Sequence, residues 1–178
     1  MSDIQAEREP MTIEQAQVTM PSDREVMVTR SFKAPRALVF RAHTEPELVR
    51  RWMLGPPGWS MPVCEMDVRV GGSYRWRWRS DTDGKEFGFV GTFREVQPPS
   101  RLVHTEGYDP GTVGGGYPSG GETLVTTTFA EAGGMTTMTT VIDFGSKDAR
   151  DAAVKTGMTD GMEQSYQLLD RVLQEPGI

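Results

Sequence analysis

The stretch GMTDGMEQSYQLLDRVL, residues 157–173, decides the fold because it is the clearest helical segment of the chain. Its mostly apolar residues recur at spacings of three and four, which places them on one side of a helix. This side comprises Met158, Met162, Ser165, Tyr166, Leu169, Val172 and Leu173. The other side comprises Asp160, Glu163, Gln164, Gln167, Asp170 and Arg171 and is expected to face water. We predict that this helix buries its apolar side against a sheet.

The chain before this helix favours a sheet, because strand-forming residues alternate with polar ones between short turns. The predicted strands are residues 25–32, 61–68, 73–79, 86–96, 101–106, 122–130 and 135–144, with a weaker candidate within 12–20. Two short helices are predicted after the first strand, where Pro35 and Pro46 suit a first helical turn. Ser146 is predicted to be the N-cap of a further helical region, which has a break at Thr156–Gly157. The connections between the predicted strands are of hairpin length and favour antiparallel pairing. We therefore predict an α+β fold, with a curved antiparallel sheet of about six or seven strands around the long C-terminal helix.

The length of 178 residues fits one domain, which we place at residues 12–178. Residues 1–11 are polar and weakly patterned, and we interpret them as a flexible tail. Residues 107–121, GYDPGTVGGGYPSGG, predict a long glycine-rich loop. Loops of this length in compact domains tend to be functional, so this one is a candidate lid.

Composition excludes several classes of protein. The net charge of −6 argues against a nucleic-acid-binding surface. The single Cys64 excludes an internal disulfide, and the two separated histidines, His43 and His104, argue against a zinc site. No apolar run is long enough to span a membrane. We therefore expect a cytoplasmic monomer or homodimer with no metal, cofactor, nucleic-acid or membrane partner. His43, at the end of the first helix, is interpreted as a cation that favours the helix C-terminus.

Four stretches resemble a known superfamily: RSFKAPRALVFRAHTEPELVRRWM (30–53), VRVGGSYRWRWRS (68–80), FVGTFREVQPPSRLVHTE (89–106) and SKDARDAAVKTGMTDGMEQSYQLLDRVL (146–173). They are similar to the START-like (SRPBCC) helix-grip superfamily, in the branch related to the C-terminal domain of the heat-shock-protein-90 ATPase activator. The resemblance implies a curved sheet that grips the C-terminal helix, with a hydrophobic cavity between them. Relatives include ligand carriers, polyketide cyclases and chaperone regulators, so the resemblance alone does not choose an activity.

An aromatic stripe on the central strands is the main candidate for a cavity wall. Plain core packing is the alternative explanation. Methionines add a wall that adapts to different ligands, and Trp52 and Trp59 flank a Gly-Pro turn as a pocket lip or as a cover for the sheet edge. The candidate ligand-binding residues are Trp52, Trp59, Tyr74, Trp76, Trp78, Phe87, Phe89, Phe93, His104, Met138, Met158, Met162 and Tyr166. Gly157 and Gly161 are expected to let the helix approach the sheet or a ligand closely.

His104 and Glu106 lie two residues apart on one face of a strand. They are weak candidates for a general acid/base pair, assisted by Tyr166, and a hydrogen-bonded strand histidine is the alternative.

Arg75, Arg77 and Arg79 are interpreted as a solvated outer face, and Cys64 as a buried thiol. Ligand binding is the leading hypothesis, with a chaperone-regulating module and a polyketide cyclase-like or hydrolase-like enzyme as alternatives.

Overall fold

The structure, a computed structural model, describes residues 12–113 and 122–178, which form eight strands and four helices. The strands are β1 (Gln17–Thr19), β2 (Glu25–Phe32), β3 (Trp59–Met66), β4 (Ser73–Ser80), β5 (Glu86–Gln97), β6 (Arg101–Asp109), β7 (Thr123–Ala132) and β8 (Met135–Asp143). The helices are α1 (Arg36–Thr44), α2 (Pro46–Trp52), α3 (Lys147–Lys155) and α4 (Met158–Leu173).

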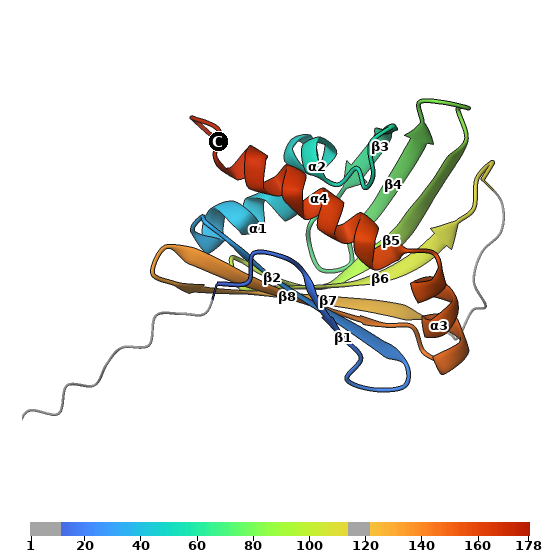
Figure 1. The fold of residues 1–178 in the computed structure, drawn as a ribbon, viewed down its shortest axis with the longest axis horizontal. Helices are drawn as coiled ribbons and strands as arrows, with labels where there is room; N and C mark the ends of the chain where they lie inside the picture. Colours follow the sequence, from blue (N-terminus) through green and yellow to red (C-terminus); the bar gives the residue numbers. More distant parts are fainter. Residues whose placement is uncertain (1–11, 114–121) are drawn as a thin grey trace, which may run out of the picture.

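The strands form one antiparallel sheet in the order β1-β2-β8-β7-β6-β5-β4-β3. The sheet curves around α4, which crosses it with β3, β4 and β5 on one side and β2, β7 and β8 on the other (Figure 1). Helices α1 and α2 pack against the same helix. The predicted α+β fold with two short helices after the first long strand is confirmed. The sheet has eight strands where about six or seven were predicted, because the weak candidate near residue 18 does pair with β2 as a three-residue edge strand.

The glycine-rich loop is shorter than predicted, because β6 continues to Asp109 rather than ending at Glu106. Gly107, Tyr108 and Asp109 pair with Val90, Phe89 and Gly88 of β5, so this part of the expected loop is strand. Residues 114–121, the centre of the candidate lid, and the predicted tail at 1–11 lie outside the described residues.

Gly157 separates the last two helices, as predicted. Its φ of 79° lies in the left-handed region, which glycine adopts without a Cβ penalty. Its N–H donates to the Val154 carbonyl at 3.1 Å, which completes the end of α3. At the other end of α3, the Ser146 hydroxyl accepts from the Ala149 N–H at 3.1 Å, and the predicted N-cap is confirmed.

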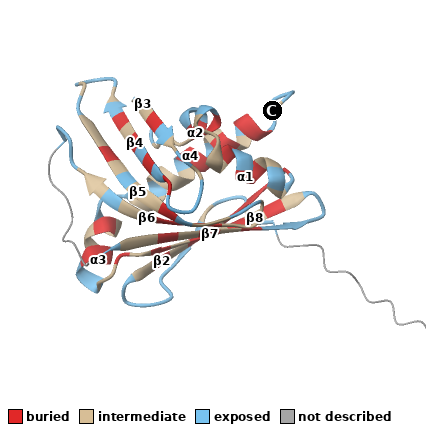
Figure 2. Ribbon diagram, turned by 180° about the vertical axis from the view of Figure 1, so that it is seen from behind, coloured by how far each residue is buried: buried red, intermediate tan, exposed pale blue. Residues whose placement is uncertain are grey.

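Two groups of buried apolar residues lie between the sheet and the helices, and Figure 2 shows them as red segments on the strands and on α4. The larger group joins α1 and α4 to β2, β7 and β8, and the smaller lies on β3, β4 and β5. Cys64 belongs to the smaller group and is buried, as predicted. On the opposite face of β4, Arg75 and Arg79 are exposed, in agreement with the predicted outer face.

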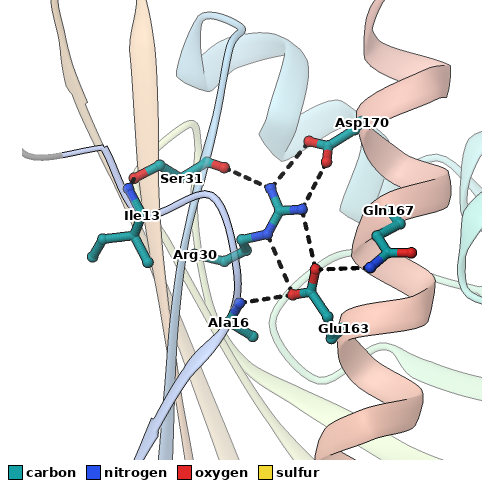
Figure 3. Close-up of polar contacts among 7 residues, drawn as sticks. All are labelled: Ile13, Ala16, Arg30, Ser31, Glu163, Gln167 and Asp170. Atoms are coloured by element: carbon teal, nitrogen blue, oxygen red, sulfur yellow. Dashed lines mark hydrogen bonds and ion pairs between the residues drawn. The ribbon is translucent and has the colours of Figure 1, made fainter.

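A buried charged residue, Arg30, lies beside the larger group. It shares one face of β2 with the buried Val28 and Phe32, and it is only 3% exposed. Its guanidinium bonds to both carboxylate oxygens of Asp170, at 3.1 and 2.7 Å, and to Glu163 at 3.4 Å (Figure 3). These two α4 carboxylates do not simply face water, as their positions on the polar side predicted. They hold the helix to β2.

The same cluster also anchors the segment before β1. The Ala16 N–H donates to Glu163 Oε2 at 2.7 Å, and the Ile13 N–H donates to the Ser31 hydroxyl at 3.1 Å (Figure 3). The start of the described chain is thereby tied to both β2 and α4.

Candidate functional site

A cavity of about 880 Å³ lies between the sheet and α4. Strands β4, β5 and β6 contribute aromatic side chains to its wall, β7 and β8 contribute part of the remaining sheet surface, and the segment after α2 covers another side. The part of α4 from Met158 to Tyr166 contributes Met158, Gly161, Met162 and Tyr166. The C-terminal half, with Leu169, Val172 and Leu173 buried, is packed into the core instead. The helix thus divides into an anchor and a cavity-lining part.

Most of the residues proposed from sequence are brought together at this cavity. Those that line it are Trp52, Trp59, Trp76, Trp78, Phe87, Phe89, Phe93, His104, Met158, Met162 and Tyr166. Their role in ligand binding stays a prediction. The spacing of two residues along each strand placed the aromatic side chains on one face, which is the concave face of the sheet.

Two proposed residues are not part of the cavity lining. Met138 is 1% exposed and packs in the larger core group. Tyr74 lies in the smaller core group, where its hydroxyl donates to the Thr105 carbonyl at 2.6 Å. This bond holds the ring beside His104, whose ring centroid is 5.0 Å away. Tyr74 therefore packs against a lining residue and does not itself line the cavity.

His43 lines the cavity, although the sequence analysis did not include it among the site residues. Its ring lies against Trp52 and Phe129, with centroids 4.7 and 5.2 Å apart. Burial lowers the pKa of His43 to about 4, so the imidazole is neutral near pH 7. The interpretation of His43 as a helix C-terminal cation is therefore wrong. His43 lies four residues after the buried Val39, on the same side of α1, and this spacing could have predicted that its side chain points inward.

His104 and Glu106 both line the cavity from β6. The Nδ1 atom of His104 lies 3.0 Å from the Thr105 carbonyl and 3.1 Å from the Tyr74 hydroxyl. Burial lowers the pKa of His104 and raises the pKa of the half-buried Glu106 carboxyl to about 7. Near neutral pH the cavity therefore contains a neutral imidazole and a carboxyl group that exists in both protonation states.

A line of hydroxyl groups crosses the cavity wall between α4 and the sheet. Tyr166 of α4, Thr140 of β8 and Thr127 of β7 all line the cavity, and the Thr140 hydroxyl lies 3.2 Å from that of Thr127. Burial raises the pKa of Tyr166 above its ordinary value, so this hydroxyl stays protonated. The wall thus offers neutral polar groups within an otherwise apolar surface.

The segment after α2 is fixed over the cavity by two hydrogen bonds. The Gly55 N–H donates to the Ser165 hydroxyl on α4 at 2.8 Å, and the Trp78 indole N–H donates to the Met53 carbonyl at 2.6 Å. Trp52 donates its indole N–H to the Ala42 carbonyl at 2.8 Å and is held as a wall. Trp59 lies edge-to-face with Phe87, with centroids 5.3 Å apart. Both tryptophans beside the Gly-Pro turn therefore form part of the cavity boundary.

Gly161 does not bring α4 close to the sheet, so that half of the sequence expectation is wrong, and close approach to a ligand stays a prediction. A Cβ atom built on Gly161 meets no other atom within 4 Å, although the residue lines the cavity. The missing side chain leaves cavity space open. Gly157 likewise has open space around its Cβ position, and its left-handed backbone explains the glycine there.

Comparison with known proteins identifies the family. The family model described as Activator of Hsp90 ATPase homolog 1-like protein matches residues 33–174. The chain belongs to this family. The predicted resemblance to the START-like (SRPBCC) superfamily and to this branch of it is confirmed. A search of the curated proteins found no match.

Solved structures of other bacterial proteins agree with this fold over most of the chain. A Rhodobacter sphaeroides protein is 31% identical, with a TM-score of 0.80, over 90% of this chain and 98% of its own. A Chromobacterium violaceum protein is 26% identical, with a TM-score of 0.73, over 88% and 99% of the two chains. An AHSA1-like protein from Aeromonas hydrophila shares the fold, at 21% identity and a TM-score of 0.63, over 85% and 97%. No helix in the described part of this chain has both the length and the apolar character to cross a membrane.

Proposed function

We propose that this protein binds a small hydrophobic or aromatic molecule in the cavity between the sheet and α4. The observation that carries the proposal is the cavity itself, about 880 Å³ in volume and walled largely by aromatic side chains and methionines. Ligand sites in proteins commonly have volumes of about 300–1,000 Å³ and mostly apolar walls with a few polar groups. Met158 and Met162 are half-buried there, and flexible thioether chains adjust to ligands of different shape.

Thermal unfolding with a library of apolar and aromatic compounds tests this function. A ligand present at about 100 times its dissociation constant stabilises the folded state by about 2.7 kcal/mol, which is readily measured. Native mass spectrometry of the purified protein shows whether a ligand is retained from the cell. If no compound shifts the melting temperature and no ligand is retained, the proposal is wrong.

A matched pair of variants locates the binding. Gly161→Leu directs a side chain into cavity space that no protein atom occupies within 4 Å of the Cβ position. Arg171→Leu places the same side chain at an exposed position on the anchor half of α4. Binding in the cavity requires that Gly161→Leu lose affinity at least tenfold and that Arg171→Leu retain it. Equal affinities would place the ligand elsewhere.

Catalysis in the same cavity is a second candidate, favoured by the position of His104 and Glu106 at the cavity wall. A neutral imidazole and a carboxyl group with a pKa of about 7 suit proton transfer near neutral pH. Incubation with polyketide-like or ester substrates, followed by mass spectrometry, tests it. Turnover must be lost in both His104→Gln and Glu106→Gln, and turnover that survives in either variant removes this candidate.

Chaperone regulation is a third candidate and rests on the family description. Affinity capture with the purified chaperone tests it directly. If this chain neither binds the chaperone nor changes its ATPase rate, the candidate is removed, whether or not the cavity binds a ligand.

A further inference from the structure

His43 presents a hydrogen-bond acceptor at the cavity. Its Nδ1 lies 2.8 Å from the Val39 carbonyl, and a carbonyl oxygen only accepts, so Nδ1 carries the proton. Because the ring is neutral, Nε2 has a free lone pair. His43 Nε2 has no hydrogen-bond partner among the described residues. Among those residues, only Trp76 Nε1 is a side-chain nitrogen or oxygen that lacks a partner and is also fully shielded from solvent. His43 Nε2 is therefore not fully shielded and remains accessible.

His104 has the same arrangement. The single hydroxyl proton of Tyr74 is used in its 2.6 Å bond to the Thr105 carbonyl, so the Tyr74 oxygen accepts from His104. The Nδ1 of His104 therefore carries the proton and faces two acceptors, at 3.0 and 3.1 Å. Its Nε2 is a second accessible acceptor without a partner in the described chain. Two neutral histidines at the cavity are thus set to receive hydrogen bonds from a ligand.

The cavity contains no matching site for an anion. Among the described residues that line it none is Lys or Arg, whereas Glu106 and Asp160 are acidic. The net charge of −6 adds long-range repulsion of anions. A carboxylate or sulfonate entering the cavity would lose its hydration without gaining a cation.

The N-terminus of α4 does not supply the missing positive charge. A helix N-terminus attracts anions, but this one has its own carboxylate, Asp160, in the first turn and at the cavity wall. The C-terminal end of α3, which has the opposite polarity, adjoins it at Thr156 and Gly157.

From these four observations we infer that the cavity selects uncharged ring compounds that carry hydrogen-bond donors, such as phenols and aromatic amines, and excludes anionic ligands of the same shape. The inference rests on the proposed binding function and specifies the chemical class of its ligand. Aromatic walls accept the rings, and the Nε2 atoms of His43 and His104 accept hydrogen bonds from the hydroxyl or amino groups.

A pair of fluorescent probes with one skeleton tests the exclusion of anions. N-phenyl-1-naphthylamine is neutral, and 8-anilinonaphthalene-1-sulfonate adds one permanent negative charge to it. At pH 8 we expect the neutral probe to bind at least tenfold more tightly. In Glu106→Gln, which removes one of the two acids of the described cavity wall and keeps a side chain of the same shape, we expect the ratio to decrease. Affinities within threefold of each other in the native chain would overturn the inference.

A second pair of ligands tests the requirement for a donor in the native protein. In displacement of the neutral probe, 2-naphthol should bind at least threefold more tightly than 2-methoxynaphthalene, because only the former donates a hydrogen bond. The preference should decrease in His104→Phe and in His43→Phe. If the methoxy compound binds equally well in the native protein, the donor requirement is wrong.

The experiments distinguish a failure of ligand binding in the cavity from a failure of the inferred selectivity. If neither fluorescent probe nor either naphthalene compound binds, the proposed binding function fails together with the inference. If all of them bind with similar affinity and Gly161→Leu weakens all of them, the cavity is a ligand site, and only its selectivity has been assigned wrongly.

Discussion

The carboxylate of Asp170 on α4 lies 2.7 Å from the guanidinium of Arg30 on β2, measured from Oδ2 to Nη2. Glu163, two helical turns earlier, contacts the same guanidinium at 3.4 Å and also accepts from the Ala16 N–H. Together these bonds join the cavity-lining helix to the sheet and to the N-terminal segment. A charge as deeply buried as that of Arg30 needs these partners.

Removal of both carboxylates should destabilise the protein strongly. Glu163→Gln combined with Asp170→Asn leaves the Arg30 charge buried without an ionic partner, and we expect a loss of about 3 kcal/mol or more in urea unfolding. Arg30→Met, which replaces the charge with an apolar chain, should cost less. Glu122→Gln is the control, because its 2.9 Å pair with Arg94 is more than half exposed on both sides, and we expect a change within about 0.5 kcal/mol. A double variant as stable as the native chain would contradict this role of the cluster.

Two glycines of the same helical region should respond to alanine in opposite directions. Gly161→Ala should stabilise the protein by about 0.5–1 kcal/mol, since Gly161 lies inside α4 with open space at its Cβ position. Gly157→Ala should destabilise it by about 1 kcal/mol, because a φ of 79° is strained for an L side chain. Chemical unfolding of both variants measures the difference. Equal effects would show that the backbone at Gly157 relaxes.

Large-to-small changes should distinguish the anchor of α4 from its cavity-lining part. Leu169 is 0% exposed, and Leu169→Ala should cost about 2–5 kcal/mol in denaturant unfolding. Met158→Ala and Met162→Ala should each cost less, because these half-buried residues already border unfilled space. Equal losses at the three positions would indicate a filled core in place of a cavity.

The Glu106 carboxyl should make stability fall as pH rises. Its pKa is raised from 4.5 to about 7 in the folded state, so the folded protein binds this proton more tightly than the unfolded chain does. The stability that this bound proton contributes is complete below about pH 4.5 and is lost as pH rises through 7. The stability of Glu106→Gln relative to the native protein should therefore increase between pH 5 and pH 7, measured by urea unfolding at each pH. A difference that does not change with pH would contradict the raised pKa.

His43 should have the opposite effect. Its pKa is lowered from 6.5 to about 4, so the unfolded chain binds this proton more readily than the folded protein. The stability due to His43 is complete above about pH 6.5 and is lost as pH falls toward 4. In His43→Phe, the decrease of stability on acidification should be smaller than in the native chain. His104, whose pKa is also lowered by burial, still contributes to the remaining decrease.

The sequence by itself determined the features that depend on local spacing. The recurrence at three and four residues identified α4, and the alternation of Tyr74, Trp76 and Trp78 placed these rings on one face of β4. Ser146 and Gly157 marked helix ends because capping and the left-handed backbone are local requirements. The family-typical order of elements then specified the curved sheet around the helix.

Only the tertiary structure decided which side chains share the cavity. Tyr74 and Met138 matched the pattern of wall residues, yet a carbonyl on β6 holds the first and close packing encloses the second. Spacing in the sequence likewise predicted that Glu163 and Asp170 face water. In the structure they bind Arg30, which lies more than a hundred residues earlier in the chain. Local periodicity gives the direction of a side chain from its own element. What it meets there depends on strand order and sheet curvature, which arise from contacts between distant parts of the chain.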